Sequence, residues 1–136
     1  MSNVTAWAGA RTNNSDKQAY YTSEELANQV VKIAKRYSDR GSSFVELGVG
    51  DGAIYNRLPE PKQGVELQRL SSKLRGVEYG KDALKWQSSM RKPIVVMNPP
   101  FSKQIAFFNH AATFSDVIVW IAGLICIASR RHLLNA

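Results

Sequence analysis

Residues 44–53 read Phe-Val-Glu-Leu-Gly-Val-Gly-Asp-Gly-Ala, and this stretch decides the fold. Residues 44–49 form a short, mostly apolar run of the kind that fills a strand buried in a parallel sheet. Gly48, Gly50 and Gly52 let the backbone approach a ligand closely, and a helix that starts behind them offers free N–H groups and a positive dipole end. The stretch therefore predicts a strand, a tight turn and a helix that suit a nucleotide-like ligand.

The same succession of strand, turn and helix extends over most of the chain. Before the stretch, Thr22 and Glu25 have the spacing of a capping box, and apolar residues then recur at helical intervals as far as Tyr37. After it, further strands are expected at 64–67, 77–79, 93–97 and 117–121, and helical segments at 53–58, 68–74, 83–86 and 103–113. This alternation predicts a Rossmann-like α/β fold, an open parallel sheet of about five strands with helices on both faces.

Length and composition allow one globular domain. The chain has 136 residues, and 18 Lys and Arg against 11 Asp and Glu give it a net charge of +7. Residues 1–19 are rich in Asn, Ser, Thr, Gly and Ala without a sustained period, so we expect a flexible N-terminal arm followed by a domain over 20–136. The positive charge favours a polyanionic partner such as nucleic acid.

The composition also argues against several classes of protein. The single cysteine, Cys126, cannot form an internal disulfide, and the first ten residues lack the pattern of a signal peptide. The longest apolar stretch, at 117–128, has 12 residues, whereas a helix that spans a bilayer needs about 20. One cysteine and two histidines without ligand spacing predict no metal site. We therefore expect a cytoplasmic protein that does not enter a membrane.

Glu46 bears on which ligand the glycine turn would bind. A carboxylate near the end of the strand repels a dinucleotide diphosphate and favours a ligand with an ammonium or sulfonium centre. Gly48, Gly50 and Ala53 nevertheless also fit the dinucleotide fingerprint, with Glu66 at the distance of a ribose-binding acid. A nicotinamide-binding domain and a turn without any ligand both remain open on this segment alone.

The Asn-Pro-Pro-Phe sequence at residues 98–101 indicates chemistry at an amino group. Pro99 and Pro100 fix the backbone after the strand, so Asn98 and Phe101 are expected in a rigid turn at the ligand-binding edge of the sheet. The side-chain carbonyl of Asn98 and the backbone carbonyl of Pro99 can accept both hydrogens of an exocyclic NH2 group. Phe101 offers a flat face on which a base can stack, which is worth about 1–3 kcal/mol.

These motifs, in this order, resemble those of the class I S-adenosylmethionine-dependent methyltransferases with an Asn/Asp-Pro-Pro-aromatic motif, best known as the N6-adenine methyltransferases. The resemblance covers roughly residues 20–122 and includes Tyr-Tyr-Thr at 20–22, ahead of the first expected helix. It implies transfer of a methyl group to an exocyclic amine, with N6 of adenine in DNA favoured over RNA. Guanine N2 and a glutamine side-chain amide are further targets within the same chemistry.

The resemblance also implies roles for residues outside the two main motifs. S-adenosyl-L-methionine would be the cofactor, with Tyr21 and Thr22 near its methionine end. Glu66 would hold the ribose hydroxyls, and Asp82 would accept a hydrogen bond from N6 of the cofactor adenine. Glu46, Gly48, Gly50 and Gly52 would complete the cofactor site.

The expected strand count departs from that family, whose sheet usually has seven strands. With five expected strands, the domain would be incomplete at its C-terminus, and the tail from residue 123 resembles no known element. The uncovered edge beside the fifth strand would then allow self-association. An inactive or truncated module that binds cofactor or nucleic acid is therefore the alternative function. The cytoplasm of a bacterium, or of the host of a phage or virus, fits either function.

Overall fold

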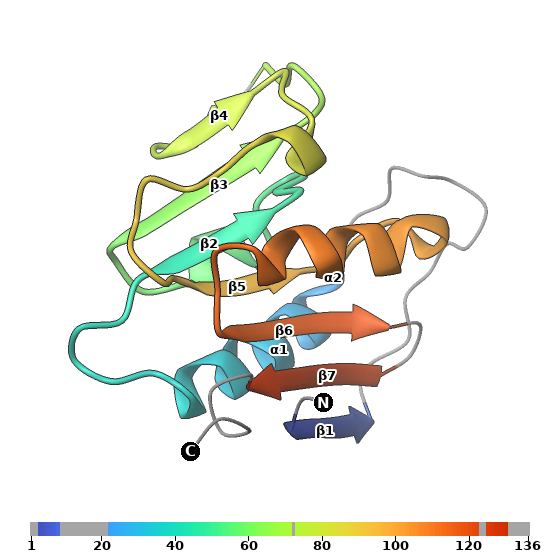
Figure 1. Ribbon diagram of the computed structural model, residues 1–136. Coiled ribbons are helices and arrows are strands. Elements are labelled where there is room, and N and C mark those ends of the chain that lie inside the picture. The colour runs from blue at the N-terminus through green and yellow to red at the C-terminus, as the bar shows by residue number, and fades with distance from the viewer. Residues whose placement is uncertain (1–2, 9–21, 72, 123–124, 131–136) are drawn as a thin grey trace.

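A seven-stranded sheet forms the centre of the molecule (Figure 1). The computed structural model describes residues 3–8, 22–71, 73–122 and 125–130. The strands are β1 (Asn3–Ala8), β2 (Phe44–Leu47), β3 (Lys62–Glu66), β4 (Val77–Tyr79), β5 (Ile94–Met97), β6 (Val117–Ala122) and β7 (Ile125–Arg130). Their order across the sheet is β1-β7-β6-β5-β2-β3-β4. The strands from β6 to β4 are mutually parallel, whereas β7 runs antiparallel to both β6 and β1.

The two central strands, β2 and β5, place the site. All four residues of each strand are buried, as expected for apolar runs in the middle of a parallel sheet. The two strands pair in register, with Leu47 opposite Met97. After β2, the strands β3 and β4 are added on one side of it, and the chain then crosses over so that β5 pairs with the other side of β2. The direction in which strands are added therefore reverses between β2 and β5. Ligands of open α/β sheets bind at the carboxyl ends of the strands at such a point.

The two α-helices lie on opposite faces of the sheet. α1 (Glu24–Arg36) buries Leu26, Val30 and Ile33 in one core cluster, whereas α2 (Gln104–Ala112) buries Phe107 and Ala111 in the other. Residues of each central strand alternate between these clusters because successive strand side chains point to opposite faces. Three short 3-10 helices complete the described structure: η1 (Tyr55–Arg57), η2 (Ala83–Lys85) and η3 (Phe101–Lys103).

The Rossmann-like α/β fold expected from the sequence is confirmed, but the expected number of strands is wrong. The sheet has seven strands rather than five, because residues 3–8 and 125–130 each add a strand. The first of these segments lies in the expected flexible arm, and the second lies in the tail that resembled no element. The edge of β6 is covered by β7 and then by β1, so the expected self-association through that edge loses its basis.

Some helical segments also differ from the prediction. Residues 53–58 form only the 3-10 turn η1, and the described residues of 68–74 are not helical. The N-cap of α1 is Ser23, whose Oγ accepts a hydrogen bond from the Leu26 N–H at 3.2 Å, so Thr22 does not cap the helix. In the part of the chain that the structure describes, no helix has the length and apolar character to cross a membrane.

Candidate functional site

Two predicted motifs come together at the carboxyl edge of the sheet. The glycine turn follows β2 and Asn98 follows β5, and these strands are neighbours. Thr22, from the segment before α1, joins them: the Asn98 Nδ2 donates a hydrogen bond to the Thr22 Oγ1 at 3.0 Å. Segments from three distant parts of the sequence therefore meet here, as expected. Tyr21 lies outside the described residues.

The glycine turn has the backbone geometry that requires glycine. Gly48, Gly50 and Gly52 have φ angles of +84°, +59° and +96°, in the left-handed region that other residues rarely adopt. Gly48 is exposed, and a Cβ placed there would meet nothing within 4 Å. At Gly52, by contrast, a Cβ would lie 2.6 Å from the Leu74 Cδ1. Gly48 thus borders open space that a ligand can enter, whereas Gly52 serves close packing.

Glu66 holds the glycine turn in place. Its Oε1 accepts a hydrogen bond from the Gly50 N–H at 2.6 Å, and its Oε2 accepts one from the Gln68 N–H at 2.9 Å. The side chain is buried at the end of β3. A carboxylate oxygen has two lone pairs, so these contacts leave the group able to accept hydrogen bonds from ligand hydroxyls. The sequence predicts Glu66 as a ligand-binding acid but gives no sign of its contact with the turn.

Glu46 is a buried acid beneath the same turn. The side chain is 2% exposed, and among the described residues its Oε1 has no hydrogen-bond partner. Burial, followed by the negative charges of Glu66 and Asp51, raises the pKa of Glu46 well above its usual range; the Tyr55 backbone N–H and Lys62 oppose this only in part. An unpaired buried acid is stabilised by a nearby cation or hydrogen-bond donor. A cation bound over the turn would favour the ionised form of this otherwise protonated acid, so the site fits a cationic ligand.

Asp82 lies at the same edge, beyond β4. It is exposed and caps η2, because its Oδ1 accepts a hydrogen bond from the Leu84 N–H at 2.9 Å. Leu67, directly after Glu66, is an exposed apolar side chain at the end of β3. Leu67 was expected at the end of this strand, which instead ends at Glu66.

The Asn-Pro-Pro-Phe segment forms the turn between β5 and η3. Asn98 is half-buried, Pro99 is buried and Phe101 is 72% exposed. The exposed ring of Phe101 is thus accessible to a planar ligand. Ile105, one helical turn further along, is 77% exposed and was not singled out in the sequence. The predicted catalytic residues Asn98, Pro99, Pro100 and Phe101 therefore extend from the buried end of a central strand to the surface.

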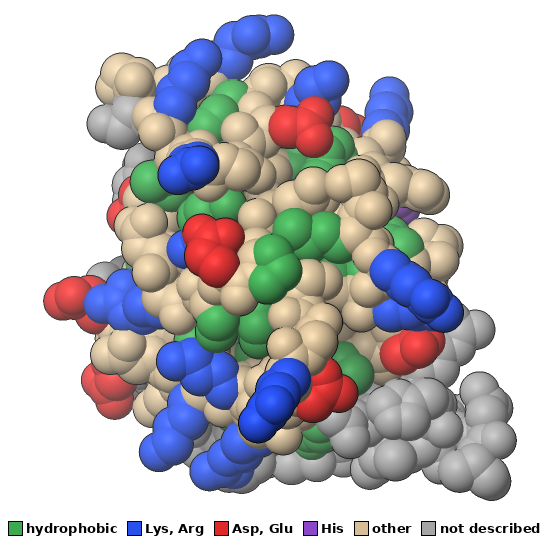
Figure 2. Space-filling model, turned by 90° about the vertical axis from the view of Figure 1, so that its left-hand side faces the viewer, with side chains coloured by type: hydrophobic (Ala, Val, Ile, Leu, Met, Phe, Trp, Pro, Cys, Tyr) green, Lys and Arg blue, Asp and Glu red, His purple; other side chains and the backbone are tan. Residues whose placement is uncertain are grey.

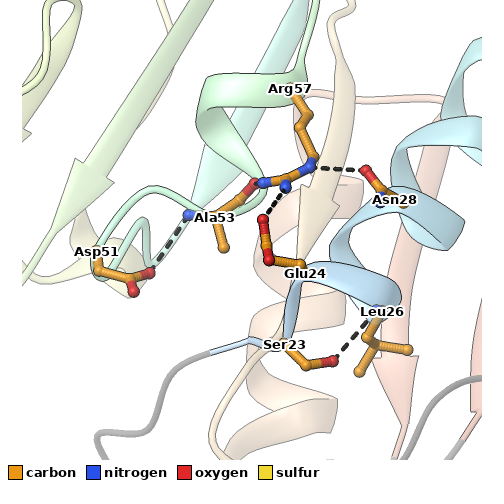
Figure 3. A network of polar contacts seen from close by, with 7 residues as sticks. All are labelled: Ser23, Glu24, Leu26, Asn28, Asp51, Ala53 and Arg57. Carbon is orange, nitrogen blue, oxygen red and sulfur yellow. Dashed lines mark hydrogen bonds and ion pairs between the residues drawn. The ribbon is translucent and has the colours of Figure 1, made fainter.

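Arg57 joins the glycine turn to the start of α1, as Figure 3 shows. Its guanidinium donates to the Asn28 Oδ1 at 2.7 Å and to the Ala53 carbonyl at 2.7 Å, and it pairs with Glu24 at 3.0 Å. The Asp51 Oδ1 accepts a hydrogen bond from the Ala53 N–H within the turn. No sequence motif indicates this role of Arg57, because two of its partners, Glu24 and Asn28, come from the separate helix α1.

The described residues contain no group of three or more His, Cys, Asp or Glu that could hold a metal ion.

Comparison with known proteins identifies similarity at the level of structure. No protein-family model matches the chain, and no curated protein matches it in sequence. Among solved structures, the chain is similar to a "putative RNA methyltransferase" from Pyrococcus horikoshii, with a TM-score of 0.60 and 21% sequence identity. The match covers 80% of this chain but 66%, just under two thirds, of that protein's chain. This likeness concerns the fold: the chain has the Rossmann-like α/β fold of that methyltransferase structure.

Proposed function

We propose that the protein is an S-adenosylmethionine-dependent methyltransferase that acts on an exocyclic amino group, with N6 of adenine in nucleic acid as the favoured target. The observation that carries this proposal is the position of Asn98 next to the glycine turn, on neighbouring strands with Leu47 opposite Met97. The turn proposed to bind a nucleotide-like ligand and the asparagine proposed to bind an amine thus lie at the same edge of the sheet.

The residues beneath the glycine turn fit S-adenosyl-L-methionine, whose sulfonium and ammonium groups are positively charged. Glu46 is buried with an unpaired oxygen, and Gly48 leaves open space above the turn. Glu66 would hold ribose hydroxyls with its remaining lone pairs, and Asp82 would accept from an adenine amino group. The negative charge of a dinucleotide diphosphate would lie near Glu66 and would further oppose ionisation of Glu46, which disfavours the nicotinamide alternative.

The catalytic contribution of the chain is positioning. The Asn98 Oδ1 and the Pro99 carbonyl would each accept one hydrogen of the target NH2 group, while Phe101 stacks against the base. The cofactor, when bound, would supply a sulfonium methyl group for the new N–C bond, with the electron pair of the S–C bond left on sulfur and the amine proton released to solvent. Holding the amine in line with the methyl group accounts for most of the rate. If the substrate is duplex nucleic acid, the base must leave the stack to reach Asn98.

Two measurements test the proposal. In the first, S-adenosyl-L-methionine is titrated into the protein by calorimetry, with reduced nicotinamide cofactors as competitors; we expect binding that the competitors do not displace. In the second, radiolabelled cofactor is incubated with the protein and with pools of DNA, RNA and protein. The DNA and RNA pools are tested side by side, since the similar solved structure is described as that of an RNA methyltransferase.

The outcomes separate the candidate functions. Label that appears in DNA or RNA with the wild type and not with Asn98→Ala supports the proposal. Label in the protein pool would indicate a glutamine side-chain amide as the target instead. Cofactor binding without transfer to any pool would leave the inactive binding module as the function. Displacement by nicotinamide cofactors would overturn both.

A further inference from the structure

The contact between Thr22 and Asn98 joins residues that are 76 positions apart in the sequence. The Asn98 Nδ2 donates to the Thr22 Oγ1 at 3.0 Å, and both side chains are half-buried. Ser23 provides the N-cap of α1, so the Thr22 hydroxyl is not needed for capping. The Thr22 hydroxyl oxygen thus accepts a hydrogen bond from the side-chain amide of Asn98, the residue proposed to bind the target amine.

The direction of this hydrogen bond matters because the two ends of an asparagine amide have almost the same shape and opposite hydrogen-bonding character. The Oδ1 end accepts hydrogen bonds, whereas the Nδ2 end only donates them. A target NH2 group presents its hydrogens to Asn98, so only the Oδ1 end can bind it as the proposed mechanism requires. An amide turned by 180° would place N–H groups against N–H groups.

We propose that Thr22 is a positioning residue that fixes which end of the Asn98 amide faces the target amine. This inference rests on the proposed function of Asn98. The hydroxyl oxygen of Thr22 holds Nδ2 on the side of α1 and thereby directs Oδ1 to the opposite side. The resemblance to methyltransferases implied a place for Thr22 at the methionine end of the cofactor; here its role is directed at the target.

The position of Thr22 is itself well fixed. α1 begins two residues later, and Arg57 ties its first turns to the segment after β2 through Glu24 and Asn28 (Figure 3). A β-branched side chain such as threonine has restricted χ1 freedom, which limits the movement of its hydroxyl. The hydrogen bond to Asn98 therefore starts from a rigid support.

The test compares Thr22→Val with Thr22→Ser. Valine keeps the shape of threonine but has no acceptor, whereas serine keeps the hydroxyl. On the nucleic-acid pool that the wild type methylates, we expect Thr22→Val to lower kcat by about three- to tenfold, the range for loss of one neutral hydrogen bond, and Thr22→Ser to restore it. The Kd for S-adenosyl-L-methionine should stay unchanged in both variants. A raised Kd with unchanged kcat would overturn the inference in favour of a cofactor-binding role.

A second arm uses Asn98→Asp as background. A carboxylate accepts hydrogen bonds at both oxygens, so it has no wrong orientation for Thr22 to prevent. We expect Thr22→Val to cost much less in the Asn98→Asp protein than in the wild type. An equal loss in both backgrounds would show that Thr22 acts by another route and would contradict the inference.

A third arm does not depend on methyl transfer. In a nitrogen-15 NMR spectrum, the side-chain NH2 signals of Asn98 are identified by their loss in Asn98→Asp. One of the two hydrogens should exchange slowly with solvent in the wild type and in Thr22→Ser, and rapidly in Thr22→Val. Equal exchange in all three proteins would refute the contact. Slow exchange in a wild type that methylates nothing would instead refute the proposed function and leave the contact in place.

Discussion

Burial gives Glu46 a proton affinity that an exposed glutamate does not have. Loss of hydration, with the nearby charges of Glu66 and Asp51, raises its pKa well above 4.5. The folded protein therefore retains a proton that the unfolded chain releases, so this group lowers the free energy of unfolding as pH rises towards the raised pKa. Glu46→Gln keeps the volume of the side chain and removes the charge. We expect the variant to be more stable than the wild type at pH 8, by about 1–3 kcal/mol, and to approach it at acidic pH.

Thermal unfolding between pH 4 and pH 8 measures this difference. The exposed Glu25 provides the control, and Glu25→Gln is not expected to reproduce the gain in stability at pH 8. A Glu46→Gln protein that is less stable than the wild type at pH 8 would contradict the assignment of Glu46 as an unpaired buried acid.

Gly48 and Gly52 have similar backbone conformations but different surroundings. Alanine at either position adopts the left-handed conformation at a cost of about 1–2 kcal/mol. At Gly52 the added Cβ also approaches Leu74 Cδ1 to 2.6 Å and Asn56 Nδ2 to 3.0 Å, whereas at Gly48 it meets nothing within 4 Å. We expect Gly52→Ala to lower the Tm more than Gly48→Ala.

The same pair of variants tests the ligand face of the turn. If the open space at Gly48 belongs to the cofactor, calorimetry should show Gly48→Ala losing about tenfold or more in affinity for S-adenosyl-L-methionine, because a methyl group occupies the place of closest approach. Unchanged affinity in a stably folded Gly48→Ala protein would show that the cofactor does not bind against this turn.

The side chain of Arg57 links the glycine turn after β2 to the first turns of α1. Its exposed ion pair with Glu24, whose side chain is 87% exposed, contributes little, because solvent screens such pairs. The hydrogen bond to the Ala53 carbonyl is partly buried, and together with the exposed bond to Asn28 it fixes the turn against α1. We expect Glu24→Gln to leave the Tm almost unchanged. Arg57→Leu should lower the free energy of unfolding by about 1–2 kcal/mol, with a matching fall in the Tm.

Amide hydrogen exchange distinguishes this link from a general loss of stability. In Arg57→Leu the amides of residues 50–57 and of the first turn of α1 should lose more protection than those of β5. A uniform loss over the whole chain would contradict a local link.

The elements that the sequence predicts well are those whose signal is local. The apolar residues of α1 recur at helical intervals, and the apolar runs of β5 and β6 are continuous. The local sequence of each element therefore shows which of its residues are buried. β1 has no such signal, since the segment Asn-Val-Thr-Ala-Trp-Ala becomes a strand by pairing with β7 near the other end of the chain. Tertiary pairing of this kind overrides weak local preference.

The candidate site likewise contains features that the local sequence predicts and contacts that it does not. The glycine turn and the Asn-Pro-Pro-Phe turn are predictable, because glycine, proline and the preceding strand constrain the backbone at each position. The contacts of Thr22 with Asn98 and of Glu66 with Gly50 are not, since each depends on where a distant element packs against the edge of the sheet. The sequence thus identifies most of the candidate residues, and the structure shows how they hold one another.

The sheet as a whole depends on its first strand. β1 covers the outer edge of β7, and an uncovered strand edge invites pairing with a second molecule. We expect a protein that begins at residue 9 to associate as its concentration rises and to unfold at a lower temperature, as measured by light scattering after size-exclusion chromatography and by thermal unfolding. A protein lacking only residues 1–2 is the control and should match the full chain. A monomeric truncated protein with the same Tm would show that β1 contributes nothing.

The net charge of +7 is not gathered into one continuous patch on the face that Figure 2 shows. This face lies at the amino ends of the parallel strands, away from the candidate site, and its Lys and Arg side chains are spread over it with Asp and Glu among them. On this face a polyanion would therefore meet mixed charges and not a single basic patch.

Identification of the methylated product tests the central claim most directly. The protein is incubated with S-adenosyl-L-methionine and adenine-containing DNA or RNA, and the digested nucleosides are analysed by mass spectrometry. We predict that N6-methyladenosine or its deoxy form accumulates with the wild type and is absent with Asn98→Ala, although both bind the cofactor with the same affinity. The absence of any methylated nucleoside with a wild-type protein that binds the cofactor, or equal product from Asn98→Ala, would contradict it.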